Sequence, residues 1–253
     1  MKVVLFSLFF LLAFPSQSST LPGSNETYAV LIVGQDVGDY APEVMDKIAY
    51  TFQSNGVKVY KFYFPNSDWN KIKAIADNCS YFVYSGHGCS MCGLDGEFGG
   101  LYINDFVMAK DFVEQIHFKR HPLVIIQNSC GAAGSSASDK GDIGFDEAKN
   151  RITDTALPYF LAGCGAYFAN NWLSGTQEFL HSFLSGKSLK AASDEIFPGF
   201  LGSPIQRSIA IPKELAGKTI SVRHEAGDIQ IEYDFAYVGE PSFMKQQIKS
   251  PVK

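Results

Sequence analysis

The sequence has no excess of positive charge and, after its first residues, no long apolar run. Its formal net charge is −5 at pH 7, which argues against the basic surface that nucleic-acid-binding proteins present. No segment after residue 14 has the ~20 mostly apolar residues that a membrane-spanning helix needs. We therefore expect neither a nucleic-acid partner nor, once any leader is removed, a membrane-bound protein.

The motifs that would imply a cofactor are also missing. Gly34 and Gly38 follow an apolar run, but they do not form the Gly-x-Gly-x-x-Gly pattern of a dinucleotide site. Cys89 and Cys92 form one Cys-x-x-Cys pair without the second pair, or the His ligands, that structural zinc requires. No Asp-x-Asp-x-Asp-Gly loop for calcium occurs. We predict no cofactor; calcium stays an open alternative that no motif in the sequence supports.

The first residues have the pattern of a secretory signal peptide. Lys2 supplies the positive charge, residues 3–14 are apolar, and Ser-Gln-Ser at 16–18 is a small-x-small cleavage site. The sequence therefore predicts removal of residues 1–18 and secretion of the mature chain, 19–253, to the extracellular or periplasmic space.

Cysteine is scarce, and an odd number of cysteines matters in an oxidising compartment. The five cysteines leave at least one thiol unpaired, and such a thiol is a candidate for reactivity. Cys89 and Cys92 are spaced for a local disulfide or, alternatively, for a redox motif. Cys79 and Cys164 either pair with each other or are simply buried.

Strand-like and helix-like segments alternate along the chain. Short β-branched or aromatic runs, typical of buried strands, lie at 28–34, 57–64, 81–85, 123–130 and 165–169. Amphipathic helices are predicted at about 40–55, 67–78, 104–116, 153–161, 176–185 and 189–196. This order predicts parallel strands with helices on both faces, that is, an α/β three-layer αβα sandwich with a mostly parallel central sheet.

The remaining segments complete a single domain. Residues 219–235 alternate around a turn and predict a C-terminal β-hairpin, so we expect a core at about 28–197 and an extension at about 210–253. Two glycine-rich loops, 89–100 and 131–150, are expected to shape a cleft. The second is longer than ordinary connections, which suggests a functional or processed loop.

Two of the predicted strands end in residues with catalytic chemistry. His87 lies in Gly-His-Gly after strand 81–85, and Cys130 lies in Ser-Cys-Gly at the end of strand 123–130. Reactive groups of open α/β sheets lie past the carboxyl ends of the strands, so the two side chains are expected to meet at one edge. Taken singly, a strand-end cysteine is usually a small buried hydrophobe and such a histidine a turn residue. Taken together, they favour a catalytic pair.

The chemistry of that pair is nucleophilic. A Cys130 thiolate attacks an acyl carbon once the His87 imidazole has taken its proton. The oxyanion that forms needs N–H donors, and the following glycines, Gly88 and Gly131, allow close backbone approach. These two amides are the first candidates for the oxyanion hole, and the amide of Cys130 is a third.

The two motifs resemble those of the caspase-like cysteine peptidases of clan CD, in particular the gingipain and caspase-like CHAT branches. The similar features are an apolar strand followed by Ser-Gly-His87-Gly, and a second followed by Gln-Asn-Ser-Cys130-Gly. The resemblance continues through 163–172, where the family has a Gly-Ala strand leading to a substrate-facing Trp, and into the final helices at 179–192. It implies a caspase-like fold over about 28–197, a dyad of His87 and Cys130, and Trp172 beside the S1 pocket. The caspase histidine precedes its cysteine by roughly 50 residues, a similar spacing.

The substrate preference follows less directly from this resemblance. Gingipains and clostripain cut after Arg or Lys and use an acidic S1 residue. By that resemblance Asp95, Asp139 and Asp142 are candidates for the acid, and the alternative is that they are solvated loop residues. The caspase Gln-Ala-Cys-Arg-Gly and legumain Glu-Ala-Cys contexts are absent, so a preference for Asp or Asn at P1 is not inherited.

The sequence therefore predicts a secreted, monomeric cysteine endopeptidase that acts on protein or peptide substrates through a thioester, with a preference for basic P1 residues. Two alternatives stay open. One is a catalytically silent binding protein on a caspase-like scaffold, which an occluded cleft or a Cys130 disulfide would support. The other is a transpeptidase or amidase with the same dyad, which ligated products would favour.

Overall fold

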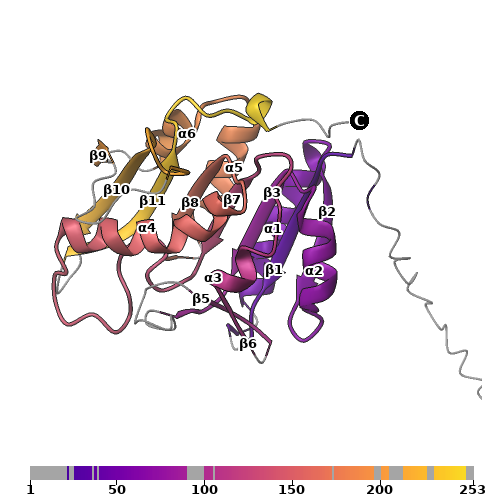
Figure 1. Cartoon of the computed structure of the whole chain (residues 1–253), viewed down its shortest axis with the longest axis horizontal. Helices are drawn as coiled ribbons and strands as arrows, with labels where there is room; N and C mark the ends of the chain where they lie inside the picture. Colours follow the sequence, from indigo (N-terminus) through magenta and orange to yellow (C-terminus); the bar gives the residue numbers. More distant parts are fainter. Residues whose placement is uncertain are drawn as a thin grey trace, which may run out of the picture.

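The computed structural model describes residues 22, 26–35, 37–38, 40–89, 100–104, 106–172, 174–196, 201–204, 213–226 and 231–248 (Figure 1). The predicted signal peptide, Cys92 and Asp95 lie outside the described residues. No helix among those described is both long enough and apolar enough to cross a membrane.

An eight-stranded sheet forms the centre, in the order β2-β1-β3-β7-β8-β11-β10-β9 (Figure 1). The first five strands in this order are parallel, and the last three join antiparallel. The strands are β1 (Tyr28–Val33), β2 (Lys58–Tyr63), β3 (Tyr81–Ser85), β7 (Leu123–Gln127), β8 (Ala166–Asn170), β9 (Leu201–Pro204), β10 (Thr219–Ala226) and β11 (Ile231–Gly239). A separate antiparallel sheet contains β4 (Gly88–Cys89), β5 (Gly100–Ile103) and β6 (Phe106–Ala109).

The helices cover both faces of the central sheet, which confirms the predicted three-layer α/β architecture. They are α1 (Tyr40–Ser54), α2 (Trp69–Ala76), α3 (Lys110–Val113), α4 (Phe145–Leu161), α5 (Thr176–Leu184) and α6 (Leu189–Ile196), and a 3₁₀ turn spans Lys245–Gln247. Alternate strand residues divide between two cores, because successive side chains of a strand point to opposite faces. One core packs against α2 and α4, and the other against α1, α5 and α6.

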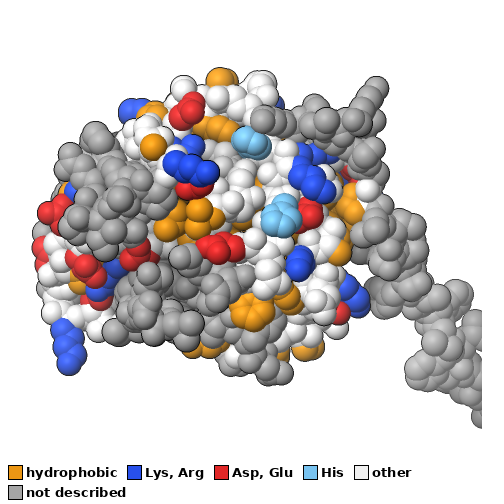
Figure 2. Space-filling model, in the orientation of Figure 1, with side chains coloured by type: hydrophobic (Ala, Val, Ile, Leu, Met, Phe, Trp, Pro, Cys, Tyr) orange, Lys and Arg blue, Asp and Glu red, His pale blue; other side chains and the backbone are white. Residues whose placement is uncertain are grey.

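The strand sequences explain their places in the sheet. Every residue of β1, β3, β7 and β8 is buried, as expected for parallel strands covered on both faces. The edge strand β2 instead exposes Lys58 and Lys61, whose charges discourage pairing with another chain. On the face shown in Figure 2, acidic and basic side chains of the coloured residues are interspersed.

The predicted C-terminal hairpin is confirmed, and it extends the central sheet. Strand β11 pairs antiparallel with β8, with Phe235 opposite Asn170 and Val238 opposite Tyr167. The hairpin therefore brings residues from the end of the chain to the edge where β7 and β8 end.

Two helix predictions were wrong in their bounds or type. Of the helix expected at 104–116 only α3, Lys110–Val113, forms, because Asn104 has a φ of +50° and turns the chain from β5 into β6, with Ile103 opposite Phe106. Asparagine tolerates positive φ in two-residue hairpin turns, so here it acts as a turn residue and not as a helix cap. Helix α4, expected from 153, begins at Phe145, which shortens the loop after Cys130.

The buried interpretation of Cys79 and Cys164 is confirmed, and the alternative of a disulfide between them was wrong. Both thiols are free and buried. Burial raises the pKa of each well above the usual value for cysteine, so neither forms a thiolate readily. A Cys89–Cys92 disulfide stays a prediction, because Cys92 lies outside the described residues.

Candidate active site

The two motifs begin at the carboxyl ends of neighbouring parallel strands. Strands β3 and β7 are paired in register from Tyr81 opposite Leu123 to Ser85 opposite Gln127, so they end at the same level. Just beyond, the Gly86 N–H donates to the Gln127 carbonyl oxygen at 3.3 Å. The chain therefore leaves both strands side by side, with His87 following β3 and Cys130 following β7.

Gly88 allows the two motifs to touch. A Cβ atom at Gly88 would lie 2.9 Å from the Cys130 amide nitrogen and would overlap both the Cys130 carbonyl oxygen and Ser129 Oγ. Only glycine fits this position without displacing backbone, because real Cβ atoms do not approach so closely. The backbone after the histidine thus packs directly on the backbone that carries the cysteine.

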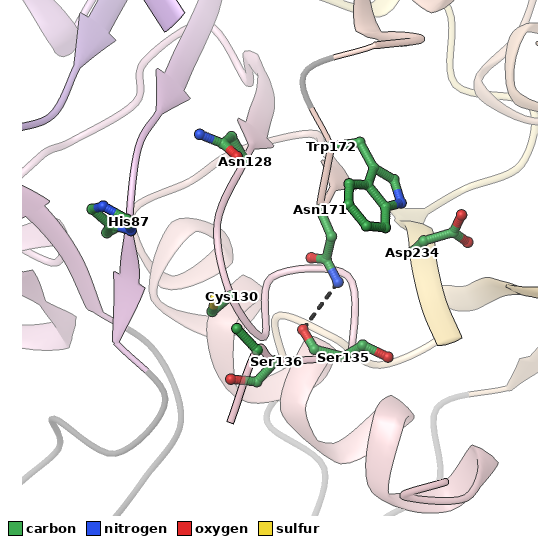
Figure 3. Close-up of a pocket in the computed structure, with 9 residues that line it drawn as sticks. His87, Asn128, Cys130, Ser135, Ser136, Asn171, Trp172 and Asp234 are labelled. Atoms are coloured by element: carbon green, nitrogen blue, oxygen red, sulfur yellow. Dashed lines mark hydrogen bonds between the residues drawn. The ribbon is translucent and has the colours of Figure 1, made fainter. Parts of the chain in front are cut away.

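A pocket of about 470 Å³ opens at this edge (Figure 3). It is lined by His87, Asn128, Cys130, Ser135, Ser136, Ala137, Asn171, Trp172 and Asp234. In Figure 3, His87 and Cys130 lie on one side of the pocket, and Trp172 and Asp234 lie on the other. His87 is exposed, and the Cys130 thiol is free and partly exposed. Both groups can therefore be reached from solvent.

The backbone amides near the thiol are not equivalent. The Gly131 N–H already donates to the Ser135 carbonyl oxygen at 2.8 Å, within a turn in which Gly131 has a φ of +81°. The Tyr102 N–H donates to the His87 carbonyl oxygen at 3.1 Å, so the next amide, that of Gly88, points away from β5. No described residue accepts a hydrogen bond from the Cys130 N–H.

Tyr84 holds the backbone at His87 in place. Its hydroxyl donates to the carbonyl oxygens of His87 and Tyr102, each at 2.9 Å, and burial raises the pKa of this phenol. A Cβ atom at Gly34 or Gly86 would collide with the Tyr84 side chain. The glycine after β1 is therefore explained by packing around Tyr84, in agreement with the absence of a dinucleotide motif.

Asn171 connects the loop after Cys130 to the hairpin. Its Nδ2 donates to the carbonyl oxygens of Ser135 at 2.9 Å and Tyr233 at 3.1 Å, and its Oδ1 accepts from the Ala133 N–H at 3.3 Å. The neighbouring Trp172 is 50% exposed at the pocket. Its place after β8 agrees with the prediction that it faces this edge, and its role toward substrate stays a prediction.

Of the three acids considered for the S1 pocket, the two that the structure describes, Asp139 and Asp142, do not line this pocket. Asp142 is exposed and does not line the pocket, because its Oδ1 accepts from the Gly144 N–H at 2.8 Å, just before α4, and from the Tyr233 hydroxyl at 3.3 Å. Asp139 is bound by Arg151, with the Arg151 NH1 nitrogen 2.8 Å from its Oδ1. Asp95 lies outside the described residues.

Among the described residues that line the pocket, Asp234 is the acidic one, and sequence reasoning missed it. It is 4% exposed and its Oδ2 lies 3.1 Å from the NH1 nitrogen of Arg223 on the paired strand β10. The signal in the sequence is a pair of acids, Glu232 and Asp234, within the otherwise mostly apolar run of β11. Nothing in that run says that the hairpin returns beside β8, where Asp234 reaches the pocket.

Among the residues that the structure describes, no group of three His, Cys, Asp or Glu side chains is arranged to hold a metal ion. No protein-family model matches this chain, and no curated protein matches it. The resemblance to caspase-like peptidases therefore rests on the sequence segments quoted for it.

Proposed function

We propose that this protein is a secreted cysteine endopeptidase that hydrolyses peptide bonds with His87 and Cys130. The observation that carries the proposal is that one open pocket is lined both by a free, partly exposed thiol and by an exposed imidazole. They lie at the carboxyl edge of a parallel sheet, where α/β enzymes place their reactive groups. Secretion is supported by the leader-like residues 1–18 of the sequence.

In the proposed reaction, the His87 imidazole takes the proton of the Cys130 thiol, and Sγ attacks the substrate carbonyl carbon. The tetrahedral intermediate collapses, the C–N bond breaks, and the imidazolium gives its proton to the departing amine. Water then attacks the thioester while His87 takes one of its protons. The acid product leaves and the Cys130 thiol is restored.

The oxyanion donors that the geometry favours are the N–H groups of Gly88 and Cys130. Gly131, also expected in this role, has its N–H engaged by Ser135. The Gly88 amide points away from the β4–β5 ladder, and the Cys130 amide belongs to the nucleophile itself. Two such donors stabilise charge that develops only after attack, which is how an oxyanion hole accelerates acyl transfer.

Asp234 and Trp172 support a preference for a basic P1 side chain. They line the pocket across from the dyad, where the buried negative charge of Asp234 attracts a cation through space and the exposed indole covers its apolar stem. Arg223 offsets part of the negative charge of Asp234. We therefore expect selectivity for Arg or Lys that is graded and not absolute.

The test is to incubate the mature chain, residues 19–253, with a diverse peptide mixture under mild reductant and to identify the products by mass spectrometry. Cys130→Ala removes the proposed nucleophile. The matched control is Cys164→Ala, which removes a buried thiol far from the chemistry. Cleavage that persists in Cys164→Ala and disappears in Cys130→Ala supports the proposal. Absence of cleavage with every variant contradicts it, and ligated peptides would instead identify a transpeptidase.

A further inference from the structure

The wall of the pocket beside Cys130 belongs to the segment that joins β7 to α4. Ser135, Ser136 and Ala137 of this segment line the pocket. The segment has no helix or strand of its own before α4 begins at Phe145. Its conformation must therefore come from side-chain and turn contacts, and the strongest of these involve Arg151 of α4.

Arg151 binds the segment at two points. Its NH1 nitrogen lies 2.8 and 3.0 Å from the two carboxylate oxygens of Asp139, and 3.3 Å from the Gly134 carbonyl oxygen. Its Nε lies 2.8 Å from Oε1 of Glu147, one turn earlier on α4. Burial lowers the pKa of Arg151, but the hydrogen bonds to Glu147 and Asp139 outweigh this effect and raise it.

Asp139 connects Arg151 to the pocket wall through hydrogen bonds with Ser136. Its Oδ2 accepts from the Ser136 N–H at 2.7 Å, and the Asp139 N–H donates to the Ser136 carbonyl oxygen at 3.0 Å. The side chains of Asp139 and Arg151 are only 7% and 13% exposed. A desolvated pair of this kind is costly to break, because removal of one partner leaves the other charge buried and uncompensated.

The other side of the wall is anchored independently. The Ser135 N–H donates to the Tyr233 carbonyl oxygen at 3.0 Å, and Ser135 Oγ accepts from the Tyr233 N–H at 2.7 Å. The Ser135 carbonyl oxygen accepts from the Gly131 N–H. The wall is thus bound at two places. Ser135 binds it to the hairpin, and the contact of Asp139 with Arg151 binds it to helix α4.

We propose that Arg151 and Asp139 are positioning residues that hold residues 134–139 as a preformed wall of the substrate pocket in the uncut chain. This inference rests on the proposed peptidase function, because that function makes the pocket a substrate pocket. The sequence left open whether this long loop is functional or processed. The inference gives the loop a function in the intact chain. Substrate binding then needs no prior cleavage between β7 and α4.

The test compares Asp139→Asn, Arg151→Gln and the double variant with Glu147→Gln as the matched control. Glu147 contacts the same Arg151 but not the loop, and its side chain is 48% exposed. Arg151→Lys is the conservative variant. Four quantities are measured: KM and kcat on a peptide substrate, the rate of Cys130 alkylation by iodoacetamide, and the rate of nicking within 131–144 by thermolysin, mapped by mass spectrometry.

We expect Asp139→Asn and Arg151→Gln each to raise KM about tenfold, with a smaller change in kcat, and to accelerate nicking at least tenfold. The double variant should be no worse than either single variant, because the two residues form one contact. Arg151→Lys should restore most of KM, and Glu147→Gln should behave as wild type. The change in KM separates positioning from a general loss of folded protein.

Folded Asp139→Asn protein with unchanged KM and unchanged nicking would overturn the proposal. If Arg151→Gln does not fold, Asp139→Asn decides alone, since it keeps the shape of the side chain. If the wild-type chain cleaves no peptide, the proposed function fails. In that case, nicking and alkylation rates still decide whether the ion pair holds the loop.

Discussion

The two sides of the pocket are built from different kinds of structure. The side with His87 and Cys130 comes from the ends of β3 and β7, parallel strands that are neighbours in the sheet and buried on both faces. The side with Trp172 and Asp234 comes from the end of β8 and from the antiparallel hairpin that extends the sheet. The proposed reaction uses the first side and the proposed substrate selection uses the second. Substitutions should therefore affect chemistry on one side and specificity on the other.

The largest effect is expected from Gly88→Ala, on the side of the dyad. The new Cβ would overlap the Cys130 carbonyl oxygen and Ser129 Oγ, so the backbone that carries the oxyanion donors must shift. Loss of one oxyanion donor typically costs about 10²–10³-fold in kcat. We expect a drop of that size, with the free energy of unfolding lowered by about 1–3 kcal/mol through overpacking.

The control for this variant is Gly56→Ala. Gly56 has a φ of +74° and nothing within 4 Å of a Cβ atom, so substitution strains the backbone far from the pocket. It should reduce the free energy of unfolding by about 1 kcal/mol and leave kcat unchanged. Steady-state kinetics and urea unfolding of both variants give the comparison. Equal kcat values for Gly88→Ala and wild type would contradict the claim that close packing at Gly88 positions the oxyanion donors.

A smaller and more selective effect is expected from Asp234→Asn, on the opposite side. Two unit charges about 8 Å apart at an effective dielectric constant of ~20 attract by about 2 kcal/mol, and Arg223 offsets part of this, so kcat/KM for substrates with Arg at P1 should fall about five- to tenfold. Substrates with an uncharged P1 side chain should lose much less. The substitution also leaves Arg223 without its carboxylate, so thermal unfolding must be measured in parallel.

Asp142→Asn is the matched control for Asp234→Asn. Asp142 is exposed, lies outside the pocket lining and accepts hydrogen bonds from Gly144 and Tyr233. It should leave the ratio of kcat/KM values for basic and uncharged P1 residues unchanged. If Asp142→Asn alters this ratio and Asp234→Asn does not, Asp142, and not Asp234, selects the basic P1 residue.

The smallest effect is expected from Trp172→Ala. Its ring is 50% exposed, and a cation–π contact at such a site contributes about 0.5–1 kcal/mol. KM for a substrate with Arg at P1 should rise about two- to fivefold, while kcat stays within a factor of two. Trp172→Phe keeps an aromatic face and should recover part of the loss. A large fall in kcat would instead place Trp172 with the chemistry.

The difference between the two sides also explains what the sequence can predict. The side of the dyad follows from local rules, because two apolar runs predict buried parallel strands and the residues after them share an edge. Asp234 could not be placed in this way, since its position depends on the pairing of β11 with β8 across a long stretch of chain. The engagement of the Gly131 N–H by the Ser135 carbonyl oxygen could not be predicted either, because only the folded loop reveals this contact.

The helix expected at 104–116 is confined to Lys110–Val113 for a related physical reason. Asparagine favours both helix caps and left-handed turns, and the sequence alone does not decide between them. Pairing of β6 with β5 selects the turn at Asn104, and the aromatic and β-branched Phe106 and Val107 suit the strand that follows. Tertiary pairing thus overrode a local preference beside the site.

The most direct test of the dyad is covalent labelling with a peptidyl acyloxymethyl ketone that ends in Arg, followed by peptide mapping. The account predicts one adduct per chain, on Cys130, with none on Cys79 or Cys164, whose thiol pKa values are raised by burial. In His87→Ala the labelling rate should fall at least 100-fold at neutral pH, because the imidazole no longer takes the proton. Labelling of Cys130 that is as fast without His87 as with it, or absent from the folded wild-type protein, would contradict the catalytic pair.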